Sequence, residues 1–215
     1  LYPSAFAGFD FSGYDVVVSN SSGFCHGITV PPGVAHLNYC LTPPRFLYAT
    51  DGYLQRERIT GPAKWVLPPI IQALRRWDVQ SVRGVTRFVA ISQAVQQRIL
   101  TLYGRESDII YPPVDTAQFA IAPQVGDFYF IAARLVPYKR VDLAVRAFTQ
   151  LGLPLWVAGD GRDRAALEAL AGPNVRFLGR VSFDRLRELY ATCRAFLFPG
   201  EEDFGIAPVE ALASG

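Results

Sequence analysis

The second half of the chain alternates short apolar segments with segments of helical periodicity, and no other feature of the sequence restricts the possible folds so strongly. The apolar segments show no polar alternation, as expected of strands whose two faces are both covered by helices. This alternation favours a doubly wound parallel α/β sheet. The predicted strands span 127–135, 153–161, 174–181 and 194–200, and the predicted helices span 141–151, 162–171, 183–193 and the residues after 205.

The first half is less regular but is built from the same kinds of element. Pro68 and Pro69 interrupt its longest predicted helix, which we therefore expect to kink or split at that point. Ser92 has the side chain of an N-cap, and Gly104 is a plausible stop for the helix that begins there. The predicted strands are 14–22, 34–44, 86–93 and a short one from 107, and the long helix spans 62–82.

The segment 112–126 contains prolines and shows no periodicity, so we place the domain boundary in it. The sequence thus predicts an N-terminal domain over 1–111, a linker over 112–126 and a C-terminal domain over 127–215. The chain contains no methionine and so no initiator, from which we expect an internal piece of a longer protein with both domains incomplete.

The net charge and the cysteine content restrict which partners this protein can bind and in which cellular compartment we expect it. With 21 Lys and Arg against 19 Asp and Glu, the net charge of +2 is too small to indicate a nucleic-acid partner. Three cysteines form no disulfide framework and indicate a reducing compartment, so we expect the cytoplasm. No apolar run has the length of a membrane span, and the first residues do not resemble a signal peptide.

Two glutamates, Glu202 and Glu210, stand eight positions apart near the end of the chain. Pro208 is suited to the first turn of a helix, which places Glu202 in the loop before it and Glu210 inside its first turn. Such a loop offers two carboxylates and several unpaired N–H groups to one ligand, which suits a polyhydroxylated sugar. The alternative is that Glu210 complements the helix dipole and Glu202 is solvated. The N–H groups belong to Phe204, Gly205, which permits a tight bend, and Ile206.

A pair of cations is predicted at the same edge of the second sheet. Arg134 stands at the end of a predicted strand, and Lys139 follows five residues later in the loop. A guanidinium beside an ammonium can hold a diphosphate, although exposed loop cations are also common without a ligand. Gly159, in the turn Gly-Asp-Gly after the next strand, is a weaker indication of a ligand.

The segments ARLVPYKR, VAGDG, VRFLGRV and EEDFGIAPVEALASG, in this order, resemble the donor domain of the group 1 (family 4-like) retaining glycosyltransferases of GT-B architecture. This family includes bacterial mannosyltransferases. The resemblance covers 14–215 and implies two Rossmann-like domains. It also implies a role for each candidate: Arg134 and Lys139 bind the donor diphosphate, Glu210 the ribose hydroxyls, and Glu202 with the N–H groups of Phe204, Gly205 and Ile206 the donor sugar. The backbone of Val181 contacts the base, and Gly159 belongs with the donor-binding residues.

The resemblance therefore implies a hexosyltransferase that moves mannose or glucose from GDP-mannose or a UDP-hexose, with retention. The acceptor is a glycan or a lipid-linked glycan, reached in the cytoplasm or at the inner face of the membrane. We expect no metal or other cofactor, because Arg134 and Lys139 supply the positive charge and no Asp-x-Asp motif ends a strand. The 215 residues alone should bind the donor poorly and turn over little.

The segment 36–48 resembles the acceptor domain of the same family, where a His-Thr-Pro-x-Arg pattern is common. Leu41 stands at the position of that histidine, while Arg45 matches and is an acceptor-side candidate or half of a structural ion pair. The missing histidine keeps open a non-catalytic nucleotide-sugar-binding module. A dinucleotide-dependent oxidoreductase is disfavoured, because no Gly-x-Gly-x-x-Gly follows a first strand.

Two other interpretations of the first half carry less weight. Cys25, His26, His36 and Cys40 suggest a zinc site, but their spacing lacks a paired Cys-x2-Cys framework. The helix with the two prolines mixes aromatic and basic residues, which fits either peripheral membrane contact or a core-facing helix whose arginines extend to solvent.

Overall fold

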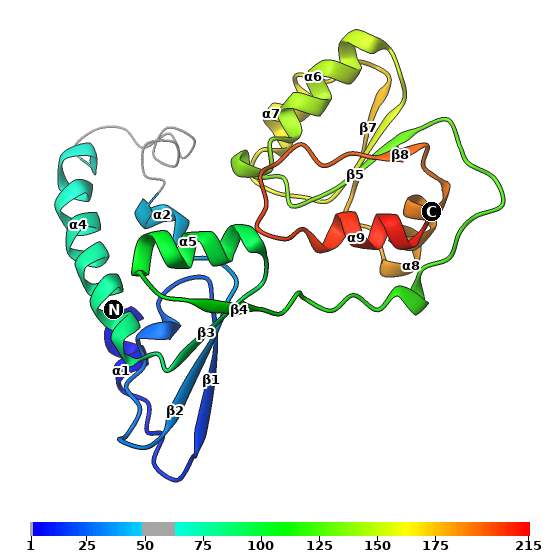
Figure 1. Ribbon diagram of the computed structural model, residues 1–215. Coiled ribbons are helices and arrows are strands. Elements are labelled where there is room, and N and C mark those ends of the chain that lie inside the picture. Colours follow the sequence, from blue (N-terminus) through cyan, green and yellow to red (C-terminus); the bar gives the residue numbers. More distant parts are fainter. Residues whose placement is uncertain (1, 49–62) are drawn as a thin grey trace. The chain divides into compact units, whose positions relative to one another are not determined.

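The computed structural model describes residues 2–48 and 63–215, and the chain divides into two compact units between Pro112 and Pro113 (Figure 1). Each unit contains a four-stranded parallel sheet with helices packed against it. The predicted α/β class with two Rossmann-like units is confirmed.

The sheet of the first unit follows the order β1-β2-β3-β4, so each strand lies beside the next one along the chain. Its core contains Phe88 of β3 and Val95 and Ile99 of α5, all fully buried. The helix boundary predicted at Ser92 is confirmed, because its Oγ accepts a hydrogen bond from the N–H of Val95. The strands are β1 (Val16–Ser21), β2 (Ala35–Cys40), β3 (Arg87–Ala90) and β4 (Ser107–Ile109), and the helices are α1 (Tyr2–Ala7), α2 (Arg45–Tyr48), α4 (Ala63–Ser81) and α5 (Gln93–Tyr103), which ends at the left-handed Gly104 as predicted.

Of the two outcomes predicted at the prolines, a kink or a split, the split does not occur, because α4 continues through them. Pro68 and Pro69 are both exposed, so water can bind the carbonyl groups that lose their helical partners. The second half of α4 is anchored to the unit: Arg75 Nε donates to the carbonyl of Leu47, and the Trp77 ring lies 5.6 Å from that of Phe24. This half of the helix therefore faces the protein interior.

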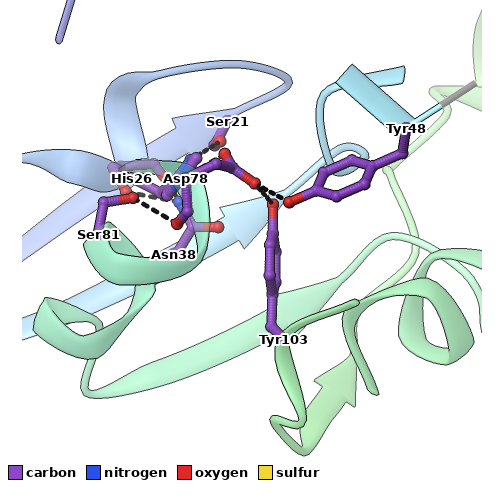
Figure 2. Close-up of polar contacts among 8 residues, drawn as sticks. Ser21, His26, Asn38, Tyr48, Asp78, Ser81 and Tyr103 are labelled. Atoms are coloured by element: carbon purple, nitrogen blue, oxygen red, sulfur yellow. Dashed lines mark hydrogen bonds and ion pairs between the residues drawn. The ribbon is translucent and has the colours of Figure 1, made fainter. Parts of the chain in front are cut away.

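A buried polar network joins five elements of the first unit (Figure 2). Asp78 of α4 is completely buried, and its Oδ2 accepts hydrogen bonds from the hydroxyl groups of Tyr48 (2.6 Å) and Tyr103 (2.9 Å). Its Oδ1 lies 3.0 Å from Nε2 of His26, whose Nδ1 lies 3.3 Å from Oγ of Ser21. Burial and the nearby Asp78 carboxylate raise the pKa of both tyrosines well above the ordinary value, so both remain hydrogen-bond donors.

The sheet of the second unit follows the order β7-β6-β5-β8. Two cores form on its opposite faces, since Ile131 faces α6 and α7 while its neighbour Phe130 packs with Leu189 and Tyr190 of α8. Figure 1 shows α6 and α7 on one side of the sheet and α8 and α9 on the other, so this unit is doubly wound as predicted. The elements are β5 (Tyr129–Ala132), α6 (Val141–Leu151), β6 (Leu155–Ala158), α7 (Arg164–Glu168), β7 (Val175–Gly179), α8 (Phe183–Thr192), β8 (Ala195–Phe196) and α9 (Ile206–Ala213).

The strand order of the second sheet reverses between β5 and β8. The chain adds β6 and β7 on one side of β5 and then returns to add β8 on the other. Consequently, the loop that leaves β5 and the loop that leaves β8 lead to helices on opposite faces. In doubly wound sheets, the crevice between two such loops is where ligands bind.

Most predicted strands, and the helix predicted over 162–171, are shorter than expected. The strand predicted over 194–200 is reduced to Ala195–Phe196, because after one further ladder bond, from the N–H of Leu197 to the carbonyl of Phe130, the chain reaches Pro199 and Gly200. The helix predicted over 162–171 is reduced to Arg164–Glu168.

Within 113–126, Gln118 accepts a hydrogen bond from Arg187 and Phe119 packs edge-on against Tyr190, so this segment is attached to the second unit.

We expect the substitution Asp78→Ala to destabilise the protein by about 3 kcal/mol or more, because it removes the acceptor of two tyrosine hydroxyls and the charged partner of the buried His26. Chemical denaturation followed by circular dichroism would measure the loss. Asp108→Ala is the matched control: Asp108 is bonded to Arg87 on the surface of the same unit, and its removal should leave the midpoint close to that of the wild type. Equal midpoints for the two variants would contradict the importance of the network.

Candidate functional site

The loop after β5 is a rigid turn that presents two cations. Residues Pro137–Lys139 form a 3-10 turn, with the N–H of Lys139 bonded to the carbonyl of Val136 (3.1 Å). Arg140 follows in the left-handed conformation at φ 52°, the one non-glycine residue with positive φ in the described part of the chain. Its guanidinium holds the carboxylate of Asp142 through two bonds of 3.1 and 3.4 Å. The exposed Arg134 and the half-buried Lys139 lie at the two ends of this loop.

The structure brings Lys139 and Glu202 together. Lys139 Nζ forms an ion pair with Oε1 of Glu202, and the two side chains are 19% and 22% exposed. One residue comes from the loop after β5 and the other from the loop after β8, so the pair joins the two loops where the strand order reverses. A cation and a carboxylate predicted from separate motifs therefore share one site.

The backbones of the two loops also touch. A Cβ atom built on Gly200 would lie 2.9 Å from the carbonyl oxygen of Lys139 and 3.0 Å from its Cα. Since a backbone atom cannot rotate away as a side chain can, only glycine allows this approach. Gly200 was absent from the sequence-based candidates, although its place between a proline and the two glutamates was visible in the sequence.

Aromatic rings surround the cations. Nη2 of Arg134 donates to the hydroxyl of Tyr138 at 3.1 Å. Nζ of Lys139 lies 5.3 Å from the ring centre of Tyr138 and 5.8 Å from that of Phe198, within the range of cation–π attraction. Neither aromatic residue was singled out in the sequence. These contacts fix the positions of both cations without neutralising them.

Glu210 lies elsewhere in the site than expected. Helix α9 begins at Ile206, because Gly205 has a φ of 83° that a helix cannot include, so Glu210 is the fifth helical residue. The prediction that it stands in the first turn is therefore wrong. Its Oε2 accepts a hydrogen bond from the hydroxyl of Tyr190 (3.3 Å), and burial together with this carboxylate raises the pKa of Tyr190. No ion pair or hydrogen bond among the described residues joins Glu210 to Glu202, Arg134 or Lys139.

The remaining candidates of the second unit also lie at loops that leave the sheet. The N–H groups of Gly205 and Ile206 stand at the start of α9, where a helix provides no acceptor of its own, and Phe204 precedes them. Gly159 has a φ of 123°, and a Cβ there would lie 1.9 Å from the carbonyl oxygen of Ala133 at the end of β5. Val181, just before α8, is partly buried against the core formed by α8 and the sheet.

The candidate of the first unit, Arg45, is the first residue of α2 and is half-buried. Leu41 follows β2, and its N–H donates to the carbonyl of Ser21 (2.7 Å). The loop between them is held from α5, because Nη1 of Arg98 lies 3.3 Å from Oγ1 of Thr42.

The residues that suggested zinc have other partners. Cys25 donates to the carbonyl of Asn20, His26 faces Asp78, and Nε2 of His36 lies 2.7 Å from Oγ of Ser19. Burial lowers the pKa of His36, which favours the neutral ring. Within residues 2–48 and 63–215, no three His, Cys, Asp or Glu gather where they could hold a metal ion, and no helix is long and apolar enough to cross a membrane.

Comparison with known proteins shows what part of this chain is similar to and shows the fold. Residues 117–215 match the family model described as "Glycosyl transferases group 1". The chain is 25% identical over 146 residues to the O-antigen chain mannosyltransferase RfbU of Salmonella typhimurium, covering 62% of this chain and 41% of RfbU. It is 40% identical over 83 residues to the GDP-mannose-dependent alpha-mannosyltransferase of Mycobacterium tuberculosis, covering 38% of this chain and 22% of that protein. The chain thus spans less than half the length of these relatives.

Two solved structures show the same fold. Sucrose-phosphate synthase from Thermosynechococcus elongatus aligns with a TM-score of 0.67 at 14% identity, over 95% of this chain and 55% of that one. Anabaena Alr3699/HepE in complex with UDP and glucose aligns with a TM-score of 0.58 at 20% identity, over 83% of this chain and 56% of that one. The predicted GT-B architecture is confirmed by this likeness.

We expect Gly200→Ala to destabilise the protein by about 1–3 kcal/mol, because the added methyl group forces the two loops apart and weakens the Lys139–Glu202 pair. Gly23→Ala is the control, since a Cβ at Gly23 would meet no atom within 4 Å. Chemical denaturation of both variants tests the contact. A loss no larger for Gly200→Ala than for Gly23→Ala would show that the loops separate without cost.

Proposed function

We propose that this protein transfers a hexose from a nucleotide sugar to a glycan or a lipid-linked glycan, with retention of configuration, because residues 117–215 match the family model of the group 1 glycosyl transferases. The observation that carries the proposal is the ion pair of Lys139 and Glu202, which joins the loops after β5 and β8 where the second sheet reverses its strand order. A cation suits the diphosphate of such a donor, and a carboxylate beside it suits the hydroxyl groups of the sugar.

The chemistry requires the bond between the anomeric carbon and the diphosphate oxygen to break as the acceptor oxygen bonds to that carbon. Negative charge then grows on the leaving diphosphate, and Arg134 and Lys139 stabilise it from fixed positions. In this proposal, the two cations replace a metal ion. The rigid 3-10 turn that holds Lys139 contributes by keeping the charge in place before the donor binds.

The carboxylates orient the rest of the donor. Glu202, with the N–H groups of Phe204, Gly205 and Ile206, binds the hydroxyl groups of the hexose near the reacting carbon. Glu210 accepts hydrogen bonds from the ribose hydroxyls, and its Oε2 also accepts a hydrogen bond from the hydroxyl of Tyr190. The backbone of Val181 contacts the base, and Gly159, where only glycine fits against the carbonyl of Ala133, belongs with the donor-binding residues.

The relatives favour GDP-mannose as the donor, because one is named as GDP-mannose-dependent and another as an O-antigen chain mannosyltransferase. A UDP-hexose is the other donor class, represented by the neighbour solved with UDP and glucose. We place the reaction in the cytoplasm. Contact of α4 with a membrane surface stays a prediction, and the inward orientation of Arg75 and Trp77 supports the core-facing alternative for that half of the helix.

A thermal-shift screen of GDP-mannose, GDP-glucose, UDP-glucose and UDP-N-acetylglucosamine on the full-length protein tests donor binding. We expect one base class to raise the melting temperature and Arg134→Ala to weaken binding about 10- to 100-fold, as loss of a charge-assisted contact predicts. Arg194→Ala is the matched control. Arg194 is exposed and directly precedes β8, so it lies at the amino ends of the parallel strands, whereas Arg134 lies at their carboxyl ends. Equal binding by both variants, or no shift with any nucleotide sugar, would refute the assigned site.

Glu202→Ala separates an enzyme from a binding module. We expect this variant to lose transfer and slow donor hydrolysis by at least about 100-fold, because the sugar is no longer oriented at the reacting carbon. Radiolabelled donor, with glycan products resolved by chromatography, measures both activities. If the wild-type protein binds the donor but neither transfers nor hydrolyses it, the non-catalytic alternative, favoured by Leu41 in place of the family histidine, is correct.

A further inference from the structure

Tyr138 stands between the two cations of the site, and neither the family match nor the sequence assigns it a role. It occupies the centre of the 3-10 turn whose last residue is Lys139. Its hydroxyl oxygen lies 3.1 Å from Nη2 of Arg134, and its ring centre lies 5.3 Å from Nζ of Lys139. Whatever anion the two cations bind must therefore lie close to this phenol.

The bond to Arg134 fixes how the phenol can act. A guanidinium has only donors, so the Tyr138 oxygen must be the acceptor in this contact. The O–H hydrogen of Tyr138 is then available to a second partner, and none of the described residues accepts it. Arg134 thereby leaves the Tyr138 hydroxyl as a neutral donor beside both cations.

The turn that carries Tyr138 is held from both ends. Pro137 fixes its own φ, and the N–H of Arg140 bonds to the carbonyl of Pro137 (3.2 Å). Arg140 adopts a left-handed conformation that disfavours side-chain-bearing residues, and its guanidinium is bonded to Asp142. Such strain persists where the surroundings fix the backbone, so Tyr138 is held in place before any ligand arrives. The guanidinium of Arg140 is bonded to Asp142 of α6.

We propose that the Tyr138 hydroxyl donates a hydrogen bond to the diphosphate of the donor, as a third ligand beside Arg134 and Lys139. This inference rests on the proposed function, since it names a further ligand of the same site. The hydroxyl adds a contact without adding charge, and a bond from a neutral donor to an anion is stronger than one between neutral groups. Tyr138 thus binds the part of the donor that becomes the leaving group.

The test is Tyr138→Phe, which keeps the ring over Lys139 and removes only the hydroxyl. We expect the dissociation constant of GDP or UDP, whichever the full-length wild-type protein binds, to rise about tenfold in isothermal titration calorimetry. The affinity for inorganic pyrophosphate, measured by competition, should fall by the same factor. Tyr129→Phe is the control. Tyr129 is the first residue of β5, at the end of the strand away from Tyr138, and its ring packs on Phe148.

The outcomes separate this inference from the function it rests on. If the wild-type protein binds neither GDP nor UDP, the proposed function fails. If it binds one of them and Tyr138→Phe binds equally well, the function stands and the hydroxyl contact is refuted, even if Tyr138→Leu binds weakly through loss of the ring. If Tyr138→Phe loses affinity for the nucleotide but not for pyrophosphate, the hydroxyl contacts the base or a sugar, and the proposal is also overturned.

Discussion

The close approach of two loops at the reversal of the second sheet is the constraint on which the candidate site depends. The chain leaves β5 toward a helix on one face and leaves β8 toward a helix on the other, so the loops diverge as they leave the strands. Gly200 allows the second loop to touch the backbone of Lys139, and the ion pair to Glu202 closes the contact. Because position 200 has no side chain, Lys139 and Glu202, which are far apart in the sequence, can meet at this contact.

The sequence predicted the layers of the fold because burial on both faces leaves a readable pattern in the strands. Helix boundaries set by local chemistry, such as Ser92 and Gly104, were also predictable, since a cap depends on a few adjacent residues. The continuous α4 was not, because Pro68 and Pro69 are tolerated only through their exposure to water, which is a tertiary property. The position of Glu210 in its helix failed for a related reason, since the left-handed Gly205 delays the helix start.

The features that were not predicted from the sequence are contacts between segments far apart in the chain. The network around Asp78 joins residues from positions 21 to 103, and no spacing rule relates them. The zinc alternative, which the sequence disfavoured on spacing, arose from four Cys and His residues, and one of them, His26, faces Asp78 in the folded chain. In the site itself, the cations and Glu202 were found through motifs, whereas Tyr138, Phe198 and Gly200 act through geometry that only the folded chain defines.

The Lys139–Glu202 pair gives the proposed site an order of events. Without a donor, each partner satisfies the other's charge in a place where both are mostly shielded from water. A diphosphate that binds Lys139 takes the place of Glu202 as its counter-ion, and the released carboxylate can then accept hydrogen bonds from the hexose hydroxyls. Exchange of one charged partner for another costs less than desolvating a free ammonium, because the lysine is never left buried without an anion. In the proposed function, engagement of the sugar by Glu202 would thus follow recognition of the diphosphate, and the two halves of donor binding would be coupled.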